Sequence, residues 1–216
     1  MSSYLLDAAP AADRRLLIDR ALRLEAFTIG WMVVEAAVTL AAGATAGSLT
    51  LTVFGIDSLI ELASACVLIW RLTVELRHGR EFSEAIERRA SRVAGALLFA
   101  LAAYIVLAAA WRFWTGTAQE FSPLGLAVVL LAIPVMRLLA RGKLELATRL
   151  GSRALRADAV ESLTCFWLSL VVVVGLVCNF AFRAWWIDPV TSLGVLWFVV
   201  REAREAWAGE ACGCCD

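Results

Sequence analysis

Apolar residues occur along this 216-residue chain in long blocks, without the regular alternation of apolar and polar residues that half-buried strands show. Six blocks are long enough to be membrane-spanning helices, because about 20 apolar residues cross a bilayer as a helix. They lie at residues 26–47, 48–70, 93–111, 121–139, 157–182 and 185–200. A transmembrane β-barrel would need the alternating pattern, so the sequence predicts helices.

The basic residues predict the orientation of these helices. Of the 20 Lys and Arg residues, 18 lie in the N-terminal arm, the second-to-third connection, the fourth-to-fifth connection (where Lys143 is placed) or the C-terminal arm. Only Arg112 and Arg183 lie on the other side. Short cytoplasmic segments carry the excess of Lys and Arg, so both termini are predicted to be cytoplasmic. The expected fold class is therefore an all-α integral membrane protein, a six-helix transmembrane bundle in the cell membrane.

The same pattern divides the chain into three parts. Residues 1–25 are expected to be a cytoplasmic N-terminal arm, residues 26–207 the six-span transmembrane domain, and residues 208–216 a Cys-rich cytoplasmic tail. Residues 13–20 (DRRLLIDR) are amphipathic, so they form either a short helix on the membrane surface or a helical extension of the first span. The arm lacks the order of basic, apolar and cleavage regions that defines a signal peptide.

Composition excludes several classes of function. Hydrophobic residues make up 61% of the chain, charged residues 19%, and the mean hydropathy is +0.77, which is too apolar for the surface of a soluble domain. The net formal charge is zero and no basic stripe is present, which argues against a nucleic-acid partner. The lipid bilayer is the expected surrounding. The sequence contains no nucleophile–base arrangement, phosphate loop or cofactor motif, so neither an enzyme nor a prosthetic group is expected.

The candidate chemistry lies in acidic residues within the apolar blocks, where the prediction places no Lys. These acids are Glu35, Asp57, Glu61, Asp158, Glu161 and Asp188. An ionised side chain inside a bilayer is costly and faces the bundle interior or a water-filled cavity. Each such carboxyl group therefore either takes up a proton or holds a cation. Alternation between these two states is the chemistry of a proton-coupled cation transporter.

Spacing places two groups of these residues on helix faces. Asp57 and Glu61 are four residues apart and share one face of a helix. Asp158, Glu161 and Cys165 are spaced by three and then four residues, so they also share one face. If the two faces meet, Asp57, Glu61, Glu161 and Cys165 offer four ligands, which suits a tetrahedral ion such as zinc. A site richer in carboxylate and water oxygens would suit a harder ion.

Three further acids are candidate accessory ligands, and each has a structural alternative. Asp158 lies close to Arg153 and Arg156, where an interfacial residue at a helix start is equally expected. Asp188 precedes Pro189, and the favoured interpretation is an N-cap of the sixth span. Glu35 either joins the site or pairs with a polar group on a neighbouring helix.

The tail contains three thiols within four residues, Cys212, Cys214 and Cys215. The predicted topology places them in a reducing compartment, where a structural disulfide is not expected. Thiolates bind soft and borderline cations, so metal capture by the tail is one interpretation. The others are palmitoylation next to the membrane and no role.

Three stretches carry a resemblance to a known family. Residues 47–49 (GSL) and 54–61 (FGIDSLIE) resemble its second span, residues 157–165 (ADAVESLTC) its fifth, and residues 185–193 (WWIDPVTSL) the start of its sixth. The pattern is similar to that of the cation diffusion facilitators, which are six-span exporters of zinc and related divalent ions. The likeness covers about residues 25–207.

The resemblance implies a site and a mechanism. By position, the transport ligands are Asp57, Glu61, Glu161 and Cys165, and export from the cytoplasm proceeds by alternating access with proton antiport. The substrate would be a divalent metal ion, zinc foremost, with cadmium, cobalt, manganese and iron as the other candidates. Family members act as homodimers, which extends to this chain as an expectation.

The sequence also departs from the family pattern. Glu61 and Cys165 stand where the family typically has aspartate, and Glu161 where it has histidine or aspartate. The chain is expected to lack the C-terminal cytoplasmic domain that members carry. The alternative function, which rests on the Cys-rich tail, is a non-transporting membrane protein that binds or senses metal through that tail.

Overall fold

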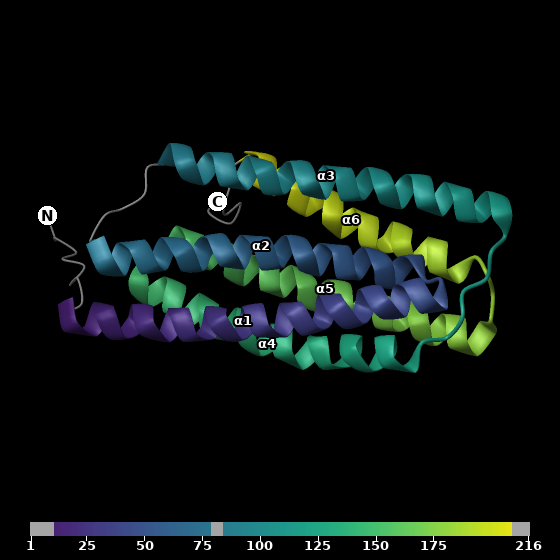
Figure 1. The fold of residues 1–216 in the computed structure, drawn as a ribbon, viewed down its shortest axis with the longest axis horizontal. Helices are drawn as coiled ribbons and strands as arrows, with labels where there is room; N and C mark the ends of the chain where they lie inside the picture. Colours follow the sequence, from purple (N-terminus) through teal and green to yellow (C-terminus); the bar gives the residue numbers. More distant parts are fainter. Residues whose placement is uncertain (1–10, 79–83, 209–216) are drawn as a thin grey trace, which may run out of the picture.

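The computed structural model describes residues 11–78 and 84–208, and in these ranges every regular element is an α-helix (Figure 1). The helices are α1 (Ala11–Ala46), α2 (Leu49–His78), α3 (Glu84–Thr115), α4 (Pro123–Leu150), α5 (Arg153–Phe182) and α6 (Ile187–Ala208). They run up and down the long axis, so α1 begins and α6 ends at the same end of the bundle. We name this the terminal end, and the other the opposite end.

The helices form two groups. α1, α2, α4 and α5 pack on one another, with α1 against α2 and α4 and with α5 against α4 and α2. α3 packs along α6, and this pair joins the four-helix group where α6 contacts α5 and α2 and where α3 contacts α2. The buried side chains of all six helices, from Met32 of α1 to Val199 of α6, form one apolar core.

The described helices are longer than the apolar blocks of the sequence. α1 runs without interruption from Ala11 through the first span, which favours the helical extension over a separate surface helix. Five helices, α1 to α5, are long and apolar enough to cross a membrane. α6 does not meet that criterion, since four of its last eight residues are charged. The prediction of an all-α membrane bundle is confirmed, whereas the side of the membrane on which the termini lie stays a prediction.

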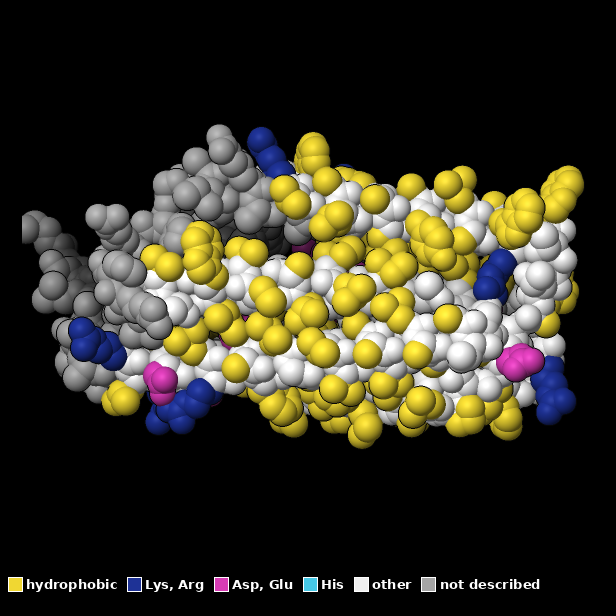
Figure 2. Space-filling model, viewed as in Figure 1, with side chains coloured by type: hydrophobic (Ala, Val, Ile, Leu, Met, Phe, Trp, Pro, Cys, Tyr) yellow, Lys and Arg dark blue, Asp and Glu magenta, His cyan; other side chains and the backbone are white. Residues whose placement is uncertain are grey.

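The outer surface of the bundle is apolar along its length. Leu107, Trp114 and Phe182, for example, are 71%, 89% and 74% exposed. Figure 2 shows hydrophobic side chains over the whole flank, with the charged side chains gathered mainly toward the two ends. In water such an apolar surface would lead to aggregation, whereas in a bilayer it would contact the equally apolar lipid tails. The face of the bundle is therefore that of an integral, multi-pass membrane protein.

Helices α1 and α2 come so close that one position between them has no room for a side chain. A Cβ atom added to Gly43 would lie 2.6 Å from Thr52 Oγ1 and 2.8 Å from the Thr52 backbone nitrogen. The backbone atom cannot move aside without moving α2. Gly43 thus lets α1 lie directly against the helix that carries Asp57 and Glu61.

We expect Gly43→Ala to destabilise the protein by about 1–3 kcal/mol through overpacking, and to lower its melting temperature in detergent micelles. Gly30→Ala is the matched control on the same helix, because a Cβ at Gly30 would have nothing within 4 Å. That change should be neutral or slightly stabilising, as Gly costs about 0.5–1 kcal/mol relative to Ala inside a helix. Equal melting temperatures for the two variants would contradict the close approach.

Candidate metal-binding site between helices α2 and α5

Two acidic side chains of α2 lie deep in the bundle. Asp57 is 2% exposed and Glu61 is 5% exposed. Neither Asp57 Oδ1 nor either carboxyl oxygen of Glu61 has a hydrogen-bond partner. Buried polar groups are almost always hydrogen-bonded, so these oxygens need another partner, either a proton or a cation.

The two predicted ligands of α5 face this position. Cys165 is 1% exposed, and its thiol lies beside the Glu61 carboxyl group. Glu161 is half-buried, and its carboxyl group lies beside Ser64 of α2. Glu61 is close enough to both Asp57 and Glu161 for their charges to repel. The two faces inferred from residue spacing do meet, at the contact between α2 and α5.

The four donors surround this contact but do not converge on a point. Within the described residues, no group of three or more His, Cys, Asp or Glu side chains is close enough to hold a metal ion together. Coordination by all four would thus require their side chains to rotate inward. What the arrangement supplies is three carboxyl groups and one thiol, a donor set that suits zinc and neighbouring borderline ions.

Glu35 of α1 lies close to the same carboxyl groups but has partners of its own. The indole Nε1 of Trp31 donates to Glu35 Oε2 at 2.6 Å, and Ser58 Oγ of α2 donates to Oε1 at 2.8 Å. Both oxygens are therefore hydrogen-bonded without a cation. This matches the alternative in which Glu35 pairs with a polar group on a neighbouring helix.

A buried lysine occupies the terminal end of the four-helix group. Lys143 of α4 is fully buried, and its ammonium group donates to Asp158 Oδ2 of α5 and lies 3.2 Å from Glu25 Oε2 of α1. The placement of Lys143 in a connection was wrong, as was the expectation that the spans contain no Lys, because α4 continues to Leu150. The sequence analysis also missed Glu25. Asp158 serves as an ion-pair partner in this structure, one helical turn from Glu161.

We expect Lys143→Met to lower the free energy of unfolding by about 3–5 kcal/mol, because it leaves Glu25 and Asp158 buried without their cation. The measurement is thermal unfolding of purified protein in detergent. Adding Glu25→Gln and Asp158→Asn to Lys143→Met should restore most of the loss, because the triple variant buries no charge at that point. Arg141→Met, an exposed change two residues away, is the control. If Lys143→Met melted like that control, the ion triad would not hold the helices.

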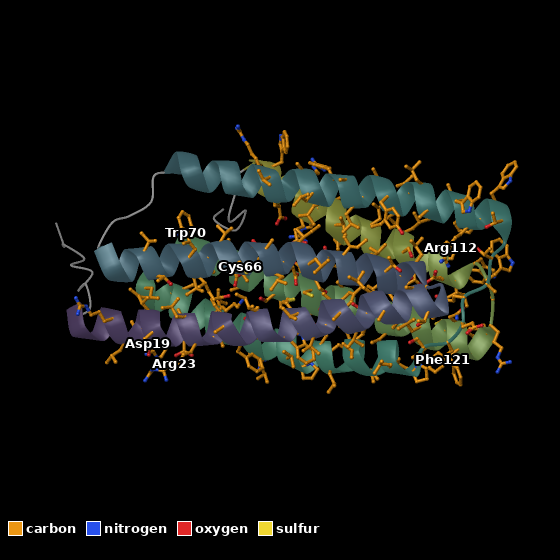
Figure 3. The ribbon with its side chains drawn as sticks, in the orientation of Figure 1. Asp19, Arg23, Cys66, Trp70, Arg112 and Phe121 are labelled. Carbon is orange, nitrogen blue, oxygen red and sulfur yellow. The ribbon has the colours of Figure 1, made fainter. Side chains whose placement is uncertain are left out.

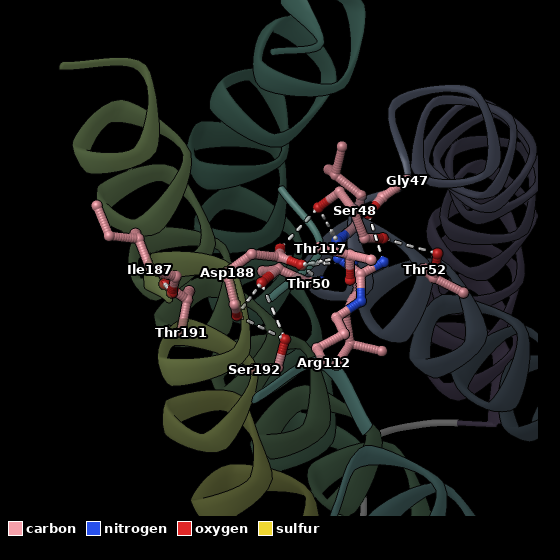
Figure 4. A network of polar contacts seen from close by, with 12 residues as sticks. Gly47, Ser48, Thr50, Thr52, Arg112, Thr117, Ile187, Asp188, Thr191 and Ser192 are labelled. Atoms are coloured by element: carbon pink, nitrogen blue, oxygen red, sulfur yellow. Dashed lines mark hydrogen bonds and ion pairs between the residues drawn. The ribbon is translucent and has the colours of Figure 1, made fainter. Parts of the chain in front are cut away.

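The opposite end is closed by a second polar network, centred on Asp188 of α6 (Figure 4). Its carboxylate accepts hydrogen bonds from the backbone N–H groups of Leu49 and Thr50 at 2.8 and 3.1 Å and from Ser48 Oγ at 2.9 Å. Ser48 Oγ in turn accepts from the Leu51 N–H. The interpretation of Asp188 as the N-cap of its own helix was wrong, since it caps the first turn of α2.

Arg112 of α3 completes this network. One guanidinium nitrogen lies 2.9 Å from Asp188 Oδ2, and the other donates to the Gly47 carbonyl oxygen. The network thus joins α2, α3 and α6 at one point. Asp57 lies eight residues after Leu49, about 12 Å along the helix, so the network also fixes the start of the helix that carries the site.

The remaining candidates lie elsewhere. Among the described cysteines, Cys66 is exposed and Cys178 half-buried, so Cys165 is the one in the core. Figure 3 shows Cys66 and Trp70 on the outer side of α2, and Arg112 and Phe121 toward the opposite end. Cys212, Cys214 and Cys215 lie outside the described residues.

Comparison with known proteins agrees with this arrangement. Residues 27–207 match the family model described as the cation efflux transmembrane domain. The chain belongs to the cation efflux family. The match includes all of α2 to α5 and most of α6, and so covers every residue of the site between α2 and α5. The resemblance to cation diffusion facilitators that the motifs indicated is confirmed.

Similarity to a protein that is named a transporter supports the same family assignment. The chain is 31% identical over 187 residues to a protein of Synechocystis sp. that is named an uncharacterized transporter. The alignment covers 82% of this chain and 60% of the relative. The chain thus spans about three fifths of the length of the relative that it matches.

Proposed function

We propose that this protein is a secondary transporter that moves a divalent transition-metal cation, zinc foremost, across the membrane in exchange for protons. Its membership of the cation efflux family supports cation transport in general. The observation that carries the proposal is the pair Asp57 and Glu61, since Asp57 Oδ1 and both Glu61 oxygens are buried without hydrogen-bond partners. In the proposal, a divalent cation is the partner in one state and protons are the partners in the other.

Proton exchange follows from the charges at the site. Ionised carboxyl groups without a bound cation would cost several kcal/mol this deep in an apolar bundle. Release of the cation therefore favours uptake of protons in its place. The reverse holds when a cation binds. Cation and protons therefore compete for Asp57, Glu61 and Glu161, and this competition is what couples their movements.

The direction of export rests on the orientation of the bundle. Its terminal end, with its excess of Lys and Arg, is proposed to be cytoplasmic, so the cation would leave the cytoplasm. Alternating access would expose the site first at the terminal end and then at the opposite end. A homodimer, which the family resemblance implies, is part of the proposal and is open to a cross-linking test.

The test is flux of zinc into liposomes that contain purified protein, with an imposed pH gradient. Asp57→Ala should reduce gradient-driven flux to that of protein-free liposomes, while the variant still inserts and elutes as a single species. Glu145→Gln, which alters an exposed acid paired with Arg149, should transport normally. Zinc transport by Asp57→Ala at the normal rate would contradict the proposal. Deleting residues 212–216 should leave flux in place, whereas a protein that acts through its tail would lose its metal response.

The identity of the ion can be tested at Cys165. A thiolate favours soft and borderline ions, whereas a carboxylate favours hard ones. We expect Cys165→Asp to lower the ratio of cadmium flux to manganese flux roughly ten-fold, equivalent to about 1.4 kcal/mol of changed preference. Cys178→Ser is the control, and it should leave the ratio unchanged. An unaltered ratio in Cys165→Asp would remove the thiol from the site.

A further inference from the structure

Helix α6 also brings a carboxylate to the site. Glu202 lies between Val199 and Ala203, both fully buried, on a helix that packs against α2 and α5. Its carboxyl group is close enough to Asp57 and Glu161 for their charges to interact, and Glu61 is in turn close to Glu202. The two motifs that define the site on α2 and α5 do not include it.

The burial of these carboxyl groups is graded. Asp57 and Glu61 are at most 5% exposed, whereas Glu161 and Glu202 are half-buried. Glu61 lies twelve residues after the start of α2, about 18 Å from the opposite end, and Glu202 lies fifteen residues after the start of α6, about 22 Å from it. Glu202, the more accessible of these two acids, thus lies farther toward the terminal end.

The surroundings of the site favour entry from that side. At the opposite end, Asp188 and Arg112 close the contact between α2, α3 and α6. About midway along the flank, Figure 2 shows an acidic side chain at the bottom of a gap between α2 and α3. Lys143 also lies toward the terminal end, where its ammonium group is engaged by Glu25 and Asp158, one helical turn from Glu161.

Glu202 alone would not define a binding position, but it lies beside the unpartnered carboxyl group of Glu61. Glu61 is 5% exposed, both its oxygens lack hydrogen-bond partners, and it is close to Glu202. A divalent cation neutralises only two of the four negative charges that Asp57, Glu61, Glu161 and Glu202 can carry. The two remaining negative charges therefore still attract the ion toward the other acids of the group.

We infer that Glu202 is the entrance carboxylate of the cation path, which binds a divalent metal ion arriving from the terminal end and passes it to Glu61. The inference rests on the proposed function. Glu202 contacts the substrate before the buried acids do, so it governs capture at low concentration. The buried acids Asp57 and Glu61 govern the transport step itself.

The test compares zinc flux as a function of zinc concentration for the full-length protein in liposomes, with zinc supplied on the side of the terminal end. Glu202→Gln should raise KM roughly ten-fold, which is the loss of about 1.4 kcal/mol of binding. It should change kcat by less than about two-fold, since a loss of binding alone leaves kcat unchanged. Glu202→Asp keeps the charge and should keep KM near that of the unmodified protein.

Glu205→Gln is the matched control, because Glu205 is exposed on the same helix and pairs with Arg201. Its KM should not change. If Glu202→Gln does not yield folded protein, Glu202→Ala takes its place with the same expected rise in KM. An unchanged KM, or a fall in kcat alone, would overturn the inference. Asp57→Ala measured alongside separates the two claims: flux in that variant would defeat the proposed function, whereas no flux together with an unchanged KM in Glu202→Gln defeats only the inference.

Discussion

Two carboxyl groups buried one helical turn apart, with three of their four oxygens lacking a hydrogen-bond partner, are the constraint around which the rest of this bundle is organised. Asp57 and Glu61 repel each other when both are ionised, and nearby Glu161 and Glu202 add to that repulsion. A stable fold must therefore bring positive charge to this point or carry protons there. Since neither the α2 backbone nor a neighbouring side chain satisfies the Glu61 oxygens, their partner has to be a proton or a cation.

The other buried polar groups differ from this pair, because the protein satisfies them itself. Asp188 is held by backbone N–H groups, a hydroxyl group and Arg112, and Glu35 is held by Trp31 and Ser58. Lys143 is held by two carboxylates. These contacts tie the helices together at each end and leave the middle unsatisfied. A site that must release its ligand cannot be satisfied permanently by protein groups, so this division of roles fits a transporter.

The sequence was sufficient to predict the six helices of residues 11–78 and 84–208 and the faces that meet at the α2–α5 contact, since apolar blocks and residue spacing are local properties. It was not sufficient for partners that are distant in the chain. Asp188 reads as a cap of its own helix, because nothing local reveals that the first turn of α2 lies against it. Lys143 was predicted to lie in a connection, because charged residues on both sides of it make the end of α4 resemble a polar loop. Glu202 follows an Arg near a predicted span end, where an acid is normally solvated.

The most direct test of the central claim is the set of atoms bound to the metal. X-ray absorption at the zinc edge of the zinc-loaded protein should show a first shell of mostly oxygen neighbours with one sulfur at about 2.3 Å. The sulfur should disappear in Cys165→Ser while zinc remains bound through the carboxyl groups. A shell of several sulfur atoms that survives this substitution would place the zinc on other cysteines, and would contradict a transport site between α2 and α5.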